Sequence, residues 1–183
     1  MSNGFTGEGE IYVGPSYRGK LVIKEEYERE QQEKWDRRFM DVAKLVSTWS
    51  KDPSSQIGAV LVKDRRILAS GYNGFPRGIE DDERLDVREK KYPLVVHAEM
   101  NVLMNALEAG ISARDATLYV YGLPICKECT KNILNSGIVR VVIGDPNECP
   151  RDDWSARWVF ESEPIFREAS HIKLAYLKGY YGS

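Results

Sequence analysis

Three side chains that could bind a metal ion lie in two short motifs. His97 lies in the segment VVHAEMN, and Cys126 and Cys129 form a C-x-x-C pair in LPICKECT. Zinc prefers such nitrogen and sulfur ligands, and structural zinc sites almost always have four of them. No fourth ligand is evident, because Cys149 lies in a separate loop and His171 begins the last expected strand. A set of three protein ligands therefore predicts a catalytic zinc site whose fourth position is open to water.

Glu99 follows His97 by two residues and is not needed as a ligand. A catalytic zinc ion lowers the pKa of its bound water to about 7, so zinc-bound hydroxide is available at neutral pH. A carboxylate that faces this water can take its proton and deliver it elsewhere as a general acid and base. Hydroxide together with a proton shuttle is suited to the hydrolytic deamination of a flat, amidine-like ring.

Each of these residues also has an ordinary explanation. His97 could be a buried histidine with satisfied hydrogen bonds, and the cysteine pair could perform thiol redox chemistry. Glu99 could be one of the acidic residues that are common in the first turn of a helix. The occurrence of all of them in one chain favours the metal site, because redox chemistry at the C-x-x-C pair gives no role to the H-A-E motif.

The elements that would position the two motifs are helices, since each motif opens a predicted helix. A helix N-terminus carries about half a positive elementary charge and unpaired amide donors, which favour a thiolate over a thiol. Hydrophobic periodicity predicts helices at 25–49, 98–109 and 126–135 and a helical pattern through 154–166. It predicts strands at 57–62, 67–72, 117–121, 138–143 and 172–177.

The order of these elements is a helix, a two-stranded hairpin, and then three strands separated by helices. This order predicts a three-layer α/β/α domain with a five-stranded mixed sheet. We divide the chain into a Gly-rich N-terminal arm, residues 1–24, and a deaminase-like domain, residues 25–183. The highly charged run at 80–91, EDDERLDVREKK, is expected to be a solvated surface insertion.

Composition and charge narrow the class of protein. The chain has 183 residues, of which 42% are hydrophobic and 30% charged, as is usual for a soluble globular domain. It has no apolar run of the ~20 residues that cross a bilayer and no secretory signal, so we expect no membrane partner and a cytoplasmic location. The net charge of −2 disfavours extended nucleic acid as a partner but is compatible with a single nucleotide.

The motifs together resemble those of the zinc-dependent cytidine deaminase superfamily, whose members carry H-x-E followed by P-C-x-x-C. Within it, the chain resembles deoxycytidylate (dCMP) deaminases through WDRRFMDVAKLVSTWSKD, SKDPSSQIGAVLV, GYNGFPRG, KYPLVVHAEMNVL and CKECTKNILNSGI. One residue departs from the pattern, because Ile125 stands between Pro124 and Cys126. The spacing of the ligands is unchanged, but the loop that would contact the base is expected to differ in shape.

The resemblance implies hydrolysis of dCMP to dUMP and ammonia, with Glu99 as the proton shuttle. It implies that Asn73 contacts the sugar or base, although Asn73 could equally be a turn residue. Tyr121 could line the ring pocket or pack in the core, and Ala98 is a further candidate for substrate contact. Lys51 and Arg77 are candidate phosphate contacts.

The resemblance also implies a homo-oligomer, commonly a hexamer, and control by dCTP with Mg²⁺ and by dTTP. Two alternatives stay open. The protein could deaminate another substrate, such as a modified dCMP, dCTP, cytidine or a base in RNA. It could instead be a zinc-stabilised assembly module without catalysis, in which case a fourth protein ligand would close the metal site.

Overall fold

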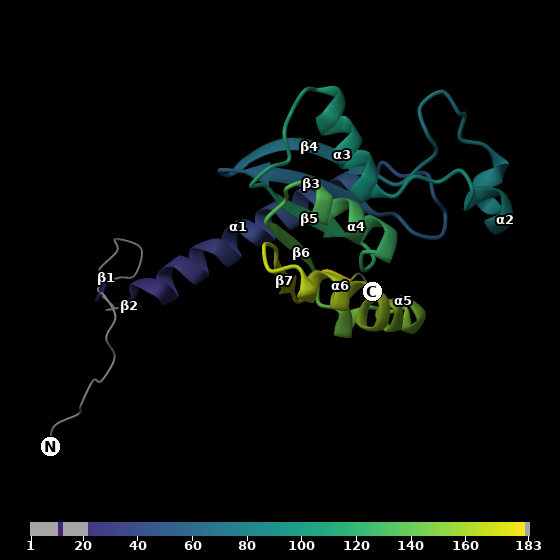
Figure 1. Ribbon diagram of the computed structural model, residues 1–183. Coiled ribbons are helices and arrows are strands. Elements are labelled where there is room, and N and C mark those ends of the chain that lie inside the picture. Colours follow the sequence, from purple (N-terminus) through teal and green to yellow (C-terminus); the bar gives the residue numbers. More distant parts are fainter. Residues whose placement is uncertain (1–10, 13–21, 182–183) are drawn as a thin grey trace, which may run out of the picture. The chain divides into compact units, whose positions relative to one another are not determined.

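The computed structural model describes residues 11–12 and 22–181. The chain divides into two compact units, residues 1–36 and 37–183. In the first unit, strands β1 (Ile11–Tyr12) and β2 (Val22–Ile23) pair antiparallel ahead of helix α1 (Lys24–Ser47), which continues into the second unit (Figure 1). Most of the predicted arm, residues 1–24, lies outside the described residues, so the predicted domain division stays a prediction.

The second unit is built on a five-stranded sheet with the order β4-β3-β5-β6-β7. Strand β3 (Gly58–Lys63) pairs antiparallel with β4 (Arg66–Tyr72) and with β5 (Thr117–Tyr121). Strands β5, β6 (Arg140–Gly144) and β7 (Lys173–Leu177) run parallel. The sheet is therefore mixed, as the sequence predicted.

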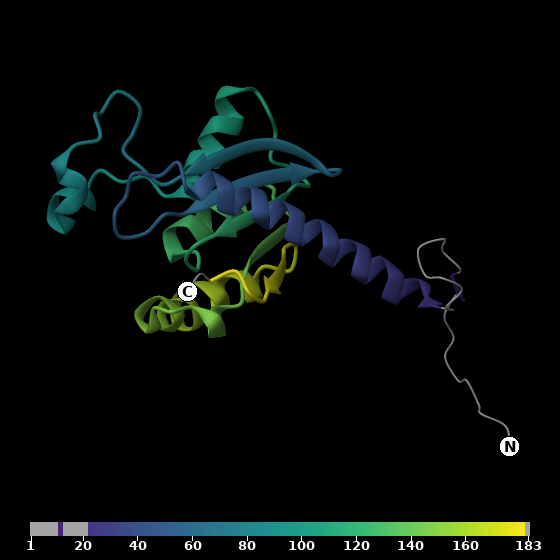
Figure 2. The same cartoon turned by 180° about the vertical axis from the view of Figure 1, so that it is seen from behind.

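Helices cover both faces of this sheet. The part of α1 in the second unit lies on one face, and α3 (Ala98–Glu108) and α4 (Lys127–Asn135) lie on the other (Figures 1 and 2). Tyr119 faces α1, since its ring centroid lies 5.4 Å from that of Phe39. Because side chains alternate along a strand, its neighbours Leu118 and Val120 face the other way and join the core beneath α3 and α4. The predicted three-layer α/β/α fold is confirmed.

Close approach of helix to sheet depends on two glycines. A Cβ atom at Gly58 would lie 2.1 Å from the carbonyl oxygen of Ala43 in α1. One at Gly71 would lie 2.4 Å from the backbone nitrogen of Val102 in α3. Only a residue without a side chain fits at either position, so both glycines allow the helices to pack directly against the strands.

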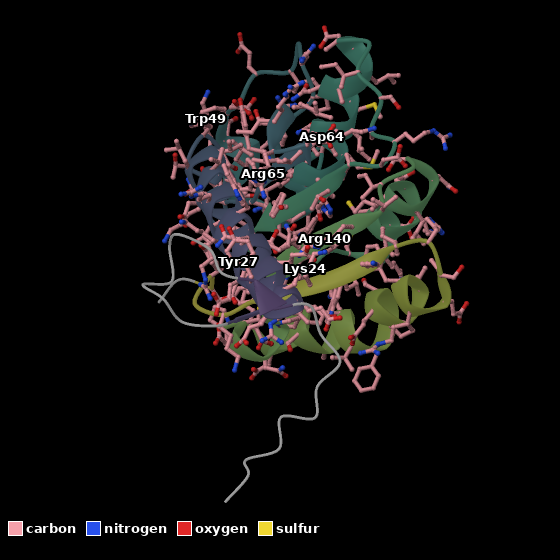
Figure 3. All side chains as sticks on the ribbon, turned by 90° about the vertical axis from the view of Figure 1, so that its left-hand side faces the viewer. Lys24, Tyr27, Trp49, Asp64, Arg65 and Arg140 are labelled. Carbon is pink, nitrogen blue, oxygen red and sulfur yellow. The ribbon has the colours of Figure 1, made fainter. Side chains whose placement is uncertain are left out.

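The hairpin between β3 and β4 closes through a two-residue turn at Asp64 and Arg65 (Figure 3). Their φ angles are 51° and 61°. Positive φ at both central residues is the signature of the type I′ turn that matches the twist of antiparallel strands. The turn adopts this geometry without a glycine.

The predicted helical pattern through 154–166 consists of three short pieces. Helix α5 (Asp152–Arg157) leads into a π-helical turn (Trp158–Ser162) and then α6 (Glu163–Glu168). Trp158 and Phe166 are both buried in the core that α3 and α4 share. This segment therefore belongs to the same layer as α3 and α4.

The charged run at 80–91 is not uniformly solvated. It contains a 3-10 turn (Glu83–Asp86) and helix α2 (Arg88–Lys91), and it buries Leu85 and Lys91. The prediction of a surface insertion was therefore wrong for the residues that face inward. None of the helices in the described part of the chain combines the length and apolar character that a membrane span needs.

Candidate active site

The two sequence motifs meet at the N-termini of neighbouring helices. His97 is the N-cap residue of α3 and Cys126 the N-cap residue of α4. The Sγ atom of Cys126 accepts a hydrogen bond from the backbone N–H of Cys129, 3.5 Å away. The helix starts that were predicted to hold the motifs are therefore present, and one backbone amide in the first turn of α4 donates to the Cys126 sulfur.

The ligand atoms of His97, Cys126 and Cys129 all lie within 4.8 Å of one another. The Nδ1 atom of His97 is 3.4 Å from each of the two Sγ atoms. Zinc bonds of about 2.0 Å to nitrogen and 2.3 Å to sulfur at a tetrahedral angle would place these atoms about 3.5 Å apart. The donor set and its spacing therefore fit a zinc ion, and the described residues hold one such group.

The electrostatics of the three side chains suit a cation. A hydrogen bond from Cys129 and contact with His97 lower the pKa of Cys126 to about 4 against the effect of burial. The adjacent Cys126 sulfur raises the pKa of His97 to about 9. The same sulfur and burial raise the pKa of Cys129. These directions favour a thiolate at Cys126 and a protonated His97 when no metal is bound, and a metal ion would replace the protons as the positive charge.

Glu99 lies in the first turn of α3 with 4% of its surface exposed. Burial raises the pKa of its carboxyl to about 7, although the charge of nearby His97 acts in the opposite direction. A carboxyl with a pKa near neutrality can both accept and donate a proton at physiological pH. Its position and chemistry match those of a general acid and base beside the metal ligands.

A cavity of about 230 Å³ opens beside the metal ligands. His97, Glu99 and Cys126 line one part of it, and Asn73 lines it as well. Its volume is slightly below the ~300 Å³ at which ligand pockets commonly start. Its other lining residues are Asp52, Ser54, Ser55, Ile57, Asp86, Arg88, Lys91, Tyr92, Val95, Leu123, Pro124, Arg151 and Trp154.

The loop between α1 and β3 is held beside the cavity by a polar network. Asp52 accepts hydrogen bonds from Lys91 Nζ at 2.8 Å and from the backbone N–H of Ser54 at 2.8 Å. The amide oxygen of Asn73 accepts from the backbone N–H of Ile57 at 2.8 Å. Asn73 is 5% exposed, so its amide both lines the cavity and organises the loop. A substrate contact for Asn73 remains a prediction.

The other predicted substrate contacts lie elsewhere. Lys51 pairs with Asp81 at 3.0 Å, and Arg77 pairs with Glu108. Neither Lys51 nor Arg77 lines the cavity, so the structure does not bring these two predicted phosphate contacts to the metal ligands.

Two further predicted contacts also lie outside the cavity lining. Ala98 is the first residue of α3 and is fully buried. Tyr121 lines a second hollow and lies under Lys44, whose Nζ is 5.7 Å from the ring centroid. The roles suggested for Ala98 and Tyr121 stay predictions, without support from the geometry.

Cationic residues that the sequence did not single out line the cavity instead. Arg88 and Lys91 come from the charged run and Arg151 from the segment before α5. The charged run at residues 80–91 indicates that cationic side chains are present in this segment. It does not show which of them line the cavity. Arg151 has no neighbouring motif and is brought to the site only by the path of the chain after β6.

Ile125, the residue that departs from the family pattern, is 1% exposed and packs in the core. Pro124 and Leu123 line the cavity beside Cys126. The additional residue is therefore accommodated by turning its side chain inward, and Cys126 still caps α4.

Comparison with known proteins agrees with this geometry. Residues 33–145 match the model of the cytidine and deoxycytidylate deaminase zinc-binding region. Over 139 residues the chain is 37% identical to an uncharacterised deaminase in the luxG 3′ region of Aliivibrio fischeri, a match to 74% of this chain and 89% of that protein. It is 38% identical over 138 residues to deoxycytidylate deaminase of Mus musculus, covering 69% of this chain and 74% of the mouse protein.

A solved structure shows the same fold. The dCMP deaminase of cyanophage S-TIM5, in complex with dCMP and dUMP, aligns with a TM-score of 0.63 over 77% of this chain and 95% of that chain, at 22% identity. The family model covers more than half of the chain, including both metal-ligand motifs. This chain belongs to the cytidine and deoxycytidylate deaminase family.

Proposed function

We propose that the protein catalyses the hydrolytic deamination of dCMP to dUMP and ammonia, with a catalytic zinc ion held by His97, Cys126 and Cys129. The observation that carries this proposal is the meeting of metal ligands and Glu99 at one small cavity. The choice of dCMP is supported by relatives that are named deoxycytidylate deaminases, such as the mouse protein.

In the reaction, water adds to C4 of the cytosine ring and the exocyclic amine leaves as ammonia. Bound zinc supplies Lewis-acid activation of water. The carboxylate of Glu99 takes a proton from the attacking water and delivers it to N3 of the ring. It then takes the remaining proton from the new hydroxyl group on C4 and delivers it to the departing amine, so that C4 becomes the carbonyl carbon of uracil. The Glu99 pKa of about 7 suits both directions of transfer. The atoms balance as dCMP plus water giving dUMP plus ammonia.

The test is a panel of substrates with zinc-loaded protein. The values of kcat/KM for dCMP, dCTP, 5-methyl-dCMP, cytidine and tRNA should be highest for dCMP. A higher value for another member of the panel would reassign the substrate. No turnover with any of them would leave the assembly module as the better interpretation.

Metal analysis distinguishes a catalytic zinc site from the closed zinc site of an assembly module without catalysis. We expect about one zinc per chain, with three protein ligands and an exchangeable water as in other catalytic zinc sites. The variant Cys126→Ser should lose the metal and the activity, whereas Cys149→Ser, at a thiol outside the ligand group, should retain both. A fourth protein ligand seen by metal spectroscopy would contradict catalysis at this site.

The finer expectations from the family resemblance are part of the proposal. These are activation by dCTP with Mg²⁺, inhibition by dTTP, a homo-oligomer, commonly a hexamer, and a cytoplasmic location. Rates that do not respond to either nucleotide would remove the regulatory part and leave the catalytic proposal intact.

A further inference from the structure

The charged side chains that line the cavity are not all available to a ligand. Lys91 and Asp52 neutralise each other, because Lys91 Nζ lies 2.8 Å from Asp52 Oδ1 and both side chains are less than 10% exposed. Lys91 also lies 3.2 Å from Ser54 Oγ. Two of the three N–H donors of Lys91 are therefore already used, and its charge is balanced by that of Asp52. The cations that remain on the wall are Arg88 and Arg151.

Arg151 is held in position by neighbours that leave part of its guanidinium group free. Its Nη1 donates to Ser55 Oγ at 3.1 Å, and its Nε lies 3.6 Å from Asp153 Oδ1. The guanidinium carbon lies 5.8 Å from the ring centroid of Trp154. A guanidinium group has five N–H donors, so donors remain for a ligand in the cavity.

Arg88 reaches the cavity from α2, a different part of the chain. Its guanidinium carbon lies 4.8 Å from the ring centroid of Tyr92, and both side chains line the cavity. Asp86 also faces the cavity, so the cationic surplus of Arg88 and Arg151 is partly offset by one carboxylate. Arginine is suited to a doubly charged phosphate, because its planar group can form two parallel hydrogen bonds to it.

The position of Arg151 suits the tail of a nucleotide. Ser55 and Arg151 line both the cavity and a more open adjacent hollow of about 670 Å³. Their hydrogen bond therefore lies at the boundary between the two spaces. A base placed at the metal ligands, as in the proposed reaction, would leave its sugar and phosphate to the rest of the cavity, whose wall includes Arg88 and Arg151.

We propose that Arg151, assisted by Arg88, binds the 5′-phosphate of the substrate and selects a nucleoside monophosphate over the free nucleoside. This inference rests on the proposed function. The assignment of Arg151 draws on the lining of the cavity and not on the family match, which ends at residue 145. It also replaces Lys51 and Arg77, which pair with acidic side chains outside the cavity.

The test compares a nucleotide with its nucleoside in matched variants. Arg151→Gln and Arg88→Gln should each lower kcat/KM for dCMP by about tenfold or more, the usual loss for one charge-assisted hydrogen bond. Their kcat/KM for deoxycytidine should stay within about twofold of the wild-type value, a change of less than half a kcal/mol. Binding of dUMP and deoxyuridine, measured by calorimetry, should show the same selective loss.

Arg167→Gln is the matched control. Arg167 is exposed, pairs with Glu163 in α6 and lines neither the cavity nor the adjacent hollow. It should leave both substrates unaffected. Equal losses for dCMP and deoxycytidine in the Arg151 and Arg88 variants would contradict phosphate binding and indicate a general structural role. A selective loss of dCMP in Lys51→Gln or Arg77→Gln, with Arg151→Gln unchanged, would also overturn the assignment.

Different results would contradict the proposed function and the assignment of the phosphate site. Wild-type protein that deaminates no cytosine nucleotide or nucleoside contradicts the proposed function itself. Efficient turnover of dCMP by the wild type, with both arginine variants unchanged, contradicts only the assignment of the phosphate site. Circular dichroism and thermal midpoints of the variants establish that each is folded before the rates are compared.

Discussion

Lys91 and Asp52 form an ion pair whose side chains are 9% and 6% exposed, and the pair joins α2 to the loop that precedes β3. Asp52 also organises that loop through the backbone N–H groups of Ser54 and Ser55. The two partners come from distant parts of the chain, and both line the cavity. The pair therefore contributes to the shape of the proposed substrate pocket rather than to its free charge.

We expect Lys91→Met to lower the free energy of unfolding by about 3–5 kcal/mol, because it leaves a buried carboxylate without its partner. Urea denaturation monitored by tryptophan fluorescence measures this change. The double variant Lys91→Met/Asp52→Leu should recover part of the loss, since it removes both buried charges. Lys63→Met is the control, because Lys63 forms an exposed pair with Asp115 and such pairs contribute about 1 kcal/mol or less. A Lys91→Met protein as stable as the Lys63→Met protein would contradict this view of the pair.

Glu99→Gln should retain zinc and lose turnover. The amide is nearly the same size as the carboxyl but cannot shuttle a proton, so kcat for dCMP should fall by about 10²–10⁴-fold. Zinc content by elemental analysis and kcat are measured on the same preparation. The matched control is Glu108→Gln at the exposed end of the same helix, which should be nearly as active as the wild type. Near-normal turnover in Glu99→Gln would falsify the proton-shuttle assignment.

Gly71→Ala should displace α3 from the sheet. The added Cβ would lie 2.4 Å from the backbone nitrogen of Val102, and overpacking of this kind costs about 1–3 kcal/mol or more. Because His97 and Glu99 open the same helix, we also expect weaker zinc binding. Gly74→Ala is the control, since its Cβ would meet nothing closer than a Tyr72 side-chain atom at 3.9 Å. Thermal midpoints and zinc affinity are compared, and equal behaviour of the two variants would contradict the packing argument.

The environment of the Tyr180 hydroxyl group predicts how the free energy of unfolding changes at alkaline pH. Its hydroxyl lies 2.9 Å from Asp41 Oδ1 and 3.1 Å from the carbonyl oxygen of Arg37. Burial and the Asp41 hydrogen bond raise the pKa of Tyr180 to about 12, against about 10 in an unfolded chain. A raised pKa means that the protonated hydroxyl stabilises the fold fully below pH ~10, and that this contribution is lost as the pH rises through ~12.

Tyr180→Phe should therefore lower stability by about 1 kcal/mol at pH 7, the usual value of one hydrogen bond. It should also reduce the loss of stability between about pH 10 and 12, the interval between the unfolded and folded pKa values. Unfolding curves at several pH values test both effects. Tyr72→Phe, at a residue with 40% of its surface exposed, should leave the alkaline profile as it is in the wild type. A profile of Tyr180→Phe that parallels the wild type would count against the role given to this hydroxyl.

Much of the fold was predictable because its signals are local. The strand expected at 117–121 is present with those bounds, since a short apolar run between turn signals has few alternatives. The strand expected at 138–143 begins two residues later than predicted, and the helix expected at 25–49 ends at Ser47. Ends of elements depend on capping and tertiary contacts, which periodicity does not encode.

The grouping of the three candidate metal ligands was also predictable, since ligand chemistry and the placement of each motif at a helix start can be inferred from neighbouring residues. His97, Cys126 and Cys129 meet because two separate helices begin at the same edge of the core. Their types and spacing in the sequence were enough to expect a zinc ion with an open position.

The packing of the sheet and helices, and not any local sequence pattern, determines which charged residues face the cavity. Lys51 and Arg77 looked suitable in the sequence but pair with acidic side chains elsewhere, whereas Arg88 and Arg151 line the cavity. A charged side chain gives no local sign of the direction in which it will point. Its direction depends on partners far along the chain, as with Lys91 and Asp52, and those partners are brought together only when the sheet and its helices pack.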